Sequence, residues 1–154
     1  MTAIDLTDRQ LVLKRTYDAS VERVFTAWTE ADAWRVWMGP KDITTEVEEF
    51  DCRPGGAFSI VMVSSEGRHP ARGKFIEVDA PRRVSLTWRW FDTPAEAEDT
   101  LMEVDMTDLG NGKTELTLTH SRFRNNEVRD RHADGWSSCF DALADFLGEK
   151  REAA

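Results

Sequence analysis

The chain has 154 residues and carries 29 acidic against 20 basic side chains, a net charge of −9. That length suits one domain, 1–154, with a core over about 9–149 that can bury most of the surface of the unfolded chain. The acidity argues against nucleic-acid binding and against docking on anionic membranes, because both need clustered Lys and Arg.

Two further features predict a reduced, cytoplasmic protein. The first eight residues contain no apolar run of signal-peptide length, and no stretch reaches the roughly 18 apolar residues of a membrane span. Cys52 and Cys139 lie far apart with no second cysteine near either. This spacing matches neither a disulfide framework nor a metal knuckle.

The first part of the chain predicts a strand followed by two short helices. Residues 9–18 alternate apolar and polar side chains, which indicates a strand. Ser20 is placed to cap a helix. Four apolar residues after it follow the spacing i, i+3, i+4, i+7: Val21, Val24, Phe25 and Trp28. Thr29 is placed to cap a second helix that Gly39-Pro40 ends.

From about residue 43 onward, alternation with period two predicts six strands in hairpin succession. They are expected over about 43–50, 58–63, 71–78, 84–90, 100–107 and 114–121. Asn111-Gly112 is the strongest hairpin signal among the turns. We expect residues 64–69 to form a hairpin loop with a solvated His69, and residues 92–99 to form an exposed acidic loop.

A long amphipathic helix over about 126–148 closes the chain, with Gly148 at its C-terminal cap and a frayed tail over 151–154. One stripe carries its apolar residues: His132, Gly135, Trp136, Cys139, Phe140, Leu143, Phe146 and Leu147. Such a stripe must be buried against a large surface, and the preceding strands make that surface a sheet. The predicted fold class is α+β, a curved antiparallel sheet of about seven strands packed on the long C-terminal helix, with two short helices after the first strand.

Five local strings in this order resemble a known family. They are Trp37-Met38-Gly39-Pro40, Asp51 to Gly56, Gly73 to Glu77 followed by Pro81-Arg82 and Thr87-Trp88, Gly112 to Thr114 with Leu116 to His120, and His132-x-x-Gly135-Trp136. Together they resemble the stand-alone bacterial members of the START/Bet v 1-like (SRPBCC) superfamily that are related to the C-terminal domain of the activator of Hsp90 ATPase. The resemblance covers about residues 9–149 and implies a helix-grip fold. The resemblance includes no counterpart of the N-terminal domain with which the eukaryotic cochaperone engages Hsp90, so chaperone activation is an alternative and not the first expectation.

The resemblance implies several functions, because the superfamily includes lipid- and polyketide-binding proteins, aromatic cyclases, oxygenase domains and a cochaperone domain. We expect a domain that holds a small apolar or aromatic ligand between the sheet and the closing helix, without a cofactor. Two alternatives stay open. The first is a protein-interaction or chaperone-associated domain, with a homodimer or another protein as partner. The second is a cyclase- or hydrolase-like enzyme.

The residues expected to contact the ligand are those that the predicted strand and helix faces turn toward the gap. They are Trp37, Phe58, Met62, Trp88, Met102, Met106, His120, His132, Trp136, Cys139 and Phe140. Core filling is the competing interpretation for most of the six tryptophans. For His132 the competing interpretation is a hydrogen bond to a backbone carbonyl. Gly135, unfavourable inside a helix, suggests that a strand backbone or the second helix packs closely there.

No catalytic or metal-binding residue is assigned. His120 and His132 could face each other across the gap, but a metal site would need a third ligand, and Cys139 matches no zinc spacing. Ser137 and Ser138 lie off the apolar stripe, no Gly-x-Ser-x-Gly elbow exists, and Cys139 is buried by pattern. Arg72 could face the gap and hold a carboxylate, whereas the alternation around Trp88 and Trp90 places Arg89 outside.

Overall fold

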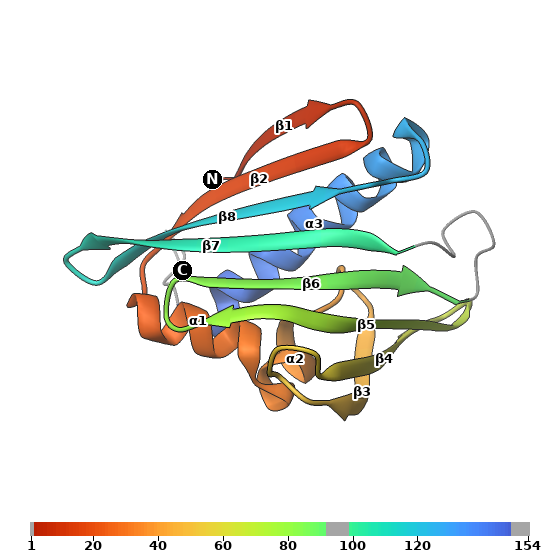
Figure 1. The fold of residues 1–154 in the computed structure, drawn as a ribbon, viewed down its shortest axis with the longest axis horizontal. Helices are drawn as coiled ribbons and strands as arrows, with labels where there is room; N and C mark the ends of the chain where they lie inside the picture. Colours follow the sequence, from red (N-terminus) through yellow and green to blue (C-terminus); the bar gives the residue numbers. More distant parts are fainter. Residues whose placement is uncertain (1, 92–98, 149–154) are drawn as a thin grey trace.

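The computed structural model describes residues 2–91 and 99–148, and within these ranges the chain forms eight strands and three helices (Figure 1). The strands are β1 (Ala3–Thr7), β2 (Gln10–Tyr17), β3 (Thr44–Phe50), β4 (Ala57–Ser64), β5 (Gly67–Asp79), β6 (Arg83–Trp90), β7 (Thr100–Gly110) and β8 (Lys113–Ser121). The helices are α1 (Val21–Thr29), α2 (Ala31–Trp37) and α3 (Asn126–Phe146). None of the helices in the described ranges is long and apolar enough to cross a membrane.

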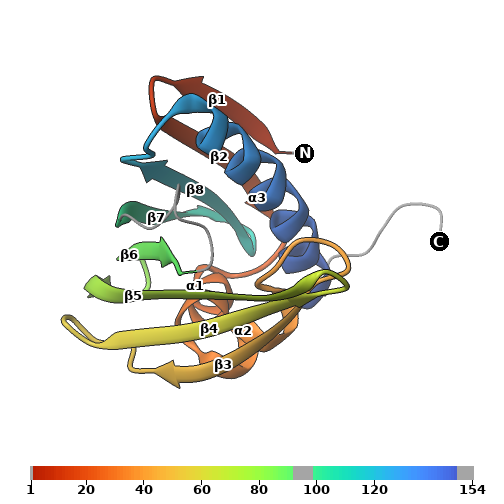
Figure 2. The same ribbon diagram turned by 90° about the vertical axis from the view of Figure 1, so that its right-hand side faces the viewer.

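All the described strands belong to one antiparallel sheet in the order β1-β2-β8-β7-β6-β5-β4-β3. From β3 to β8 each strand pairs with the next one along the chain, as consecutive hairpins require. The segment with α1 and α2 carries the chain from β2 to the far edge, and β8 returns beside β2 with Leu118 opposite Leu13. The sheet curves strongly, and α3 runs along the strands at the β1–β2–β8 end (Figure 2). This is the predicted α+β helix-grip arrangement.

The two longer helices begin at side-chain caps. Ser20 Oγ accepts a hydrogen bond from the backbone N–H of Arg23 at 3.3 Å, which starts α1 where the sequence predicted. Asn125 Oδ1 accepts from the N–H of Val128 at 2.9 Å and starts α3. Gly148 follows the end of α3 with φ +78°, the left-handed conformation that favours glycine at a helix end.

The predicted cap of the second helix is wrong. Thr29 is the last residue of α1, and its hydroxyl donates to the carbonyl of Phe25 at 2.8 Å. Glu30 precedes α2 instead, and no side-chain hydrogen bond caps this helix. A threonine hydroxyl can bond back to the preceding turn as readily as forward, which the sequence pattern alone does not decide.

Two strand assignments also differ from the prediction. The structure adds β1, a strand whose five residues are all exposed even though Ile4 and Leu6 alternate with Asp5 and Thr7. The hairpin between β4 and β5 is shorter than predicted, since only residues 65–66 separate Ser64 from Gly67. His69 therefore lies within β5, opposite Met62, and is half-buried rather than solvated in a loop.

The buried stripe of α3 is shifted from the predicted one at its two ends. Phe146 is 37% exposed, whereas Val128, Ala133 and Ala144 are buried. The predicted acidic loop lies outside the described residues except for Asp99, which is exposed, and the predicted frayed tail lies outside them entirely.

Aromatic side chains from α1 and α2 fill much of the interior. Trp28, Trp34 and Trp37 are buried, and the last two donate their indole N–H groups to the carbonyls of Trp28 and Ala27, both at 2.9 Å. Trp28 also stacks on Trp136 of α3, with ring centroids 5.8 Å apart. The short helices and α3 therefore share one face of the sheet, and core filling is the role of these three tryptophans.

Candidate functional site

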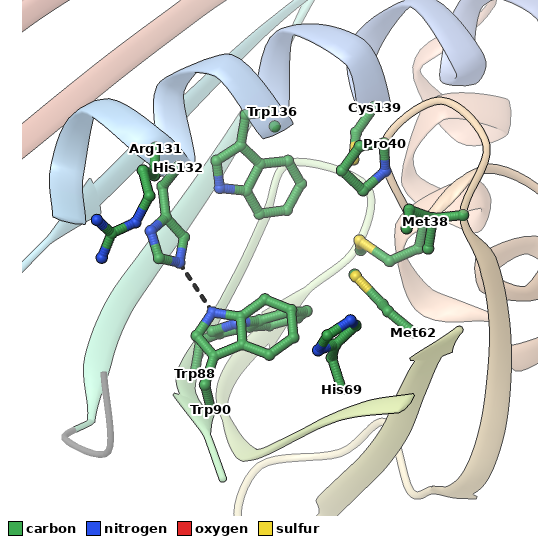
Figure 3. Close-up of a pocket in the computed structure, with 12 residues that line it drawn as sticks. Met38, Pro40, Met62, His69, Trp88, Trp90, Arg131, His132, Trp136 and Cys139 are labelled. Atoms are coloured by element: carbon green, nitrogen blue, oxygen red, sulfur yellow. Dashed lines mark hydrogen bonds between the residues drawn. The ribbon is translucent and has the colours of Figure 1, made fainter. Parts of the chain in front are cut away.

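A pocket of about 300 Å³ lies between α3, the turn after α2, and strands β4 to β6 (Figure 3). This volume is at the lower end of the range typical of small-molecule sites. Its lining consists of Met38, Pro40, Ile43, Met62, His69, Trp88, Trp90, Arg131, His132, Gly135, Trp136 and Cys139. Among the described residues, no carboxylate contributes to this lining, although the chain as a whole is strongly acidic.

Three indoles border the pocket, two from the sheet and one from α3. Trp88 and Trp90 project from the same face of β6, with ring centroids 5.6 Å apart, and Trp136 comes from α3 across the gap (Figure 3). Trp88 and Trp136 are 6.3 Å apart between centroids. Trp88 and Trp136 are nearly fully buried, whereas Trp90 is half-buried and lies at the rim.

Sulfur-containing side chains form one side of the pocket. Met38 and Met62 turn their sulfur atoms toward one another, and Cys139 lies above them on α3 (Figure 3). All three residues are buried. Thioethers make favourable contacts with aromatic rings and adapt to irregular shapes, so this side can follow the outline of a bound molecule.

The turn after α2 is fixed in place by its own hydrogen bonds. The buried Thr45 hydroxyl donates to the carbonyl of Met38, and the backbone N–H of Lys41 donates to Ser138 Oγ of α3 at 2.7 Å. A Cβ added to Gly135 would meet Pro40 Cγ at 3.6 Å, an ordinary contact. The neighbour of Gly135 is thus this turn rather than a strand backbone or α2 itself, which corrects the prediction.

His132 closes one end of the pocket by pairing with Trp90. The indole N–H of Trp90 donates to Nε2 of His132 at 2.9 Å (Figure 3). Nδ1 of His132 lies 2.9 Å from the carbonyl of Val128 one turn earlier. Since Nε2 accepts and a carbonyl cannot donate, the proton of the neutral ring sits on Nδ1. His132 therefore makes the backbone contact expected of a helix-start histidine and also borders the pocket.

His120 lies fully buried below this pair. Its Nδ1 accepts from the indole N–H of Trp136 at 3.0 Å, and its Nε2 is 2.7 Å from Thr100 Oγ1. The Thr100 hydroxyl in turn donates to the carbonyl of Trp88 at 2.8 Å. Burial, together with the nearby His132, holds the pKa of His120 well below its usual value of 6.5.

These contacts limit the chemistry that the site offers. Both ring nitrogens of His120 are engaged in hydrogen bonds, and burial raises the pKa of the Cys139 thiol to about 12 against a smaller opposing effect of the Gly39 N–H. Cys139 is thus an unreactive thiol at neutral pH. Within the described part of the chain, no three His, Cys, Asp or Glu side chains are arranged to hold a metal ion.

The structure brings together five of the eleven residues expected to contact a ligand and places six elsewhere. Those that line the pocket are Met62, Trp88, His132, Trp136 and Cys139. The other six are buried outside the pocket lining: Trp37, Phe58, Met102, Met106, His120 and Phe140. Side chains of α1 and α2 cover part of the inner face of the sheet. Phe58, for example, packs between Trp34 and Trp88 at 5.2 and 5.6 Å.

Seven lining residues were not predicted: Met38, Pro40, Ile43, His69, Trp90, Arg131 and Gly135. A signal existed for Trp90, which shares the strand face of Trp88, and for Gly135, which stood out as a glycine within a helix. The turn residues carried no such signal, since their place beside α3 depends on tertiary contacts. Arg131 is exposed and pairs with Glu127 one turn earlier at 3.2 Å.

Arg72 and Arg89 lie on the outer face of the sheet, directly opposite each other on β5 and β6. Both guanidinium groups approach the ring of Phe91, at 4.9 and 5.9 Å, and Arg89 pairs with Asp99 at 2.9 Å. The expectation for Arg89 is confirmed. Arg72 does not face the gap, so it holds no ligand carboxylate there.

The eight-stranded antiparallel sheet packs against α3, with a small aromatic pocket between them. This arrangement defines an α+β protein of the helix-grip class. The sequence profile of the Activator of Hsp90 ATPase homolog 1-like protein family matches residues 18–148. The chain belongs to this family, which is part of the SRPBCC superfamily. No curated protein matches the sequence significantly.

Solved structures of bacterial proteins share the fold at low sequence identity. A Chromobacterium violaceum protein is 23% identical with a TM-score of 0.85, over 92% of this chain and 99% of that one. A protein of Arthrobacter aurescens is 20% identical with a TM-score of 0.85, over 99% and 94% of the two chains. The AHSA1 protein of Silicibacter pomeroyi is 26% identical with a TM-score of 0.78, over 90% and 96%.

Proposed function

We propose that this protein binds a small apolar molecule in the pocket beneath α3. The observation that carries the proposal is a space of about 300 Å³, half of whose twelve lining residues are tryptophans, methionines or cysteine. A concave, largely apolar space of this size beside a dense aromatic core is a candidate for occupation by a ligand.

The pocket walls support the proposal because they are held in place before any ligand arrives. Trp90 is bonded to His132, and Trp136 is bonded to His120 and stacked on Trp28. A binding site whose side chains are already ordered loses less conformational entropy when the ligand binds. Less of the free energy gained by removing apolar ligand surface from water is then offset by the cost of ordering the site.

Gly135 offers a direct test, because a side chain at this position would project toward the pocket lining beside Pro40. The uncharged dye N-phenyl-1-naphthylamine should gain fluorescence with the wild-type protein and with Gly135→Ala, whose added methyl meets Pro40 at ordinary contact distance. Gly135→Leu should fill the space and abolish most of the gain. The dye should also raise the melting temperature of the first two proteins and not of the third, as binding to the native state requires.

Two results would contradict the proposal. Equal fluorescence with all three proteins would mean that the dye binds elsewhere on the surface. No gain with the wild type, under conditions where circular dichroism shows an intact fold, would mean that the pocket does not accept apolar molecules.

A further inference from the structure

From the walls of this pocket we infer that the ligand is a planar aromatic molecule of about one or two rings, rather than a saturated ring system or an alkyl chain. The inference rests on the proposed function and narrows it to one class of ligand. It follows from three properties of the lining: the orientation of the indoles, the position of the sulfur atoms, and the restraint on both.

The indoles present surfaces suited to another ring. Trp88 and Trp90 meet edge to face at an interplanar angle of 74°, and Trp88 and Trp136 are tilted by 59°. Their rings therefore offer both faces and edges to the space between them, and aromatic pairs prefer offset-stacked or edge-to-face arrangements. A planar ligand can complete such a cluster, whereas a puckered saturated ring cannot approach an indole face as closely.

The thioethers supply a complementary contact at the opposite side. Met38 and Met62 lie across the pocket from Trp136 and His132 (Figure 3). Sulfur atoms favour the edges of aromatic rings, so a planar ligand placed against the indoles would turn its edge toward these two side chains. An alkyl chain would gain no corresponding preference for sulfur over carbon.

Restraint of the walls disfavours a long flexible ligand. The hydrogen bonds of Trp90 and Trp136 to His132 and His120 fix both indoles, and the turn at Pro40 is tied to α3 through Ser138. Lengthening the pocket past the Trp90–His132 pair, or between the turn and α3, would break these bonds. The observed volume of about 300 Å³ is small for a ligand pocket, which suits a compact rigid molecule.

Three alcohols with the same number of carbon atoms test the inference: 2-naphthol, its saturated analogue decahydro-2-naphthol, and 1-decanol. Isothermal titration calorimetry with the full chain should show 2-naphthol binding about three- to tenfold more tightly than the saturated analogue. Hydrophobicity alone predicts the reverse order, because saturation increases the apolar character of the molecule. 1-Decanol should bind most weakly.

Two methionine variants show whether the preference for an aromatic ligand arises from a thioether in the pocket or from one in the core. Met62→Leu removes a lining thioether at nearly constant volume and should reduce the preference for 2-naphthol by about two- to threefold. Met106→Leu makes the same change at a buried residue outside the lining and should leave the preference unchanged. Melting curves of both variants close to that of the wild type would verify that each remains folded.

The outcomes distinguish this inference from the proposed function. If decahydro-2-naphthol or 1-decanol displaces the bound dye as well as 2-naphthol does, the aromatic ligand class is wrong while apolar binding stands. An equal loss of preference in Met62→Leu and Met106→Leu would also overturn it, since the selectivity would not arise in the pocket. Failure of both the dye and 2-naphthol to bind would overturn both.

Discussion

The indole N–H of Trp136 on α3 donates to Nδ1 of His120 on β8 at 3.0 Å, inside the core and directly behind the pocket. This bond sets the tautomer of His120, so the proton of the neutral ring is on Nε2 and points to Thr100. A second indole–imidazole pair runs in the opposite direction, from Trp90 on β6 to His132 on α3. Helix and sheet thus each contribute one indole and one imidazole to the contact between them.

Stability should fall with acidification because His120 stays neutral in the folded protein. Its pKa lies well below the usual 6.5, owing first to burial and second to His132. In the unfolded chain His120 takes up a proton as the pH falls through about 6.5, whereas in the folded protein it stays neutral there. The free energy of unfolding is therefore highest above about pH 6.5 and decreases as the pH falls below it. Between about pH 7.5 and about pH 5.5 the loss from this residue should be on the order of 1 kcal/mol.

Urea unfolding followed by circular dichroism at several pH values measures this loss. The range stays above the usual pKa values of Asp and Glu, so carboxylates contribute little to the slope. His120→Gln should flatten the pH dependence, whereas His69→Gln at the rim of the pocket should leave most of it in place. An unchanged slope in His120→Gln would contradict the assignment to this buried ring.

Trp136→Ala should cost roughly 3–5 kcal/mol of unfolding free energy, because the indole is only 5% exposed and packs on Trp28. Trp136→Phe keeps an aromatic ring but leaves Nδ1 of His120 buried without its donor, a loss of about 1–3 kcal/mol. Denaturant titration of both variants gives the two values. A cost below about 1 kcal/mol for the alanine variant, with the fold intact, would place the indole on a solvent-filled wall instead of in packed core.

Hydrophobic periodicity predicted most of the fold because most elements have one buried face. Strand β8 alternates with the period of its backbone, as Leu116 and Leu118 show, whereas β4 is buried continuously from Phe58 to Met62. Strand β1 has no buried residue, although its sequence alternates apolar and polar side chains over residues 4–7. Ile4 and Leu6 lie on one of its faces, but both remain more than 40% exposed.

The pocket was harder to predict than the core around it. Sequence parity shows that Phe58 and Met106 face inward, but it cannot show whether inward-facing atoms meet another side chain or empty space. That distinction depends on how far the aromatic residues of α1 and α2 reach across the sheet. The position of Pro40 against Gly135 likewise arises from the packing of a turn on a distant helix.

Gly135→Ala should stabilise the fold by about 1 kcal/mol, even though the residue borders the pocket. Gly135 lies within α3 and has no left-handed φ angle, and glycine in a helix interior is less favourable than alanine by about that amount. The added methyl meets Pro40 Cγ at 3.6 Å without crowding. Thermal and urea unfolding measure the gain, and a loss of stability would show that the turn at Pro40 packs more tightly than this contact indicates.

Gly39→Ala should destabilise the protein more than Gly67→Ala, although the two glycines have nearly the same backbone conformation. Their φ angles are +139° and +141°, so an alanine is strained at either position. At Gly39 the new Cβ would also lie 2.9 Å from Thr45 Oγ1 and 3.2 Å from Ile43 Cγ2, whereas at Gly67 it meets nothing within 4 Å. Because the backbone strain is the same in both variants, the difference between their unfolding free energies measures the steric crowding at Gly39, in the turn that holds Met38 and Pro40. We expect this difference to be about 1–3 kcal/mol. Only Gly39→Ala should also weaken binding of N-phenyl-1-naphthylamine, because it alone moves a pocket wall, and equal dye affinity in the two variants would contradict this account of the turn.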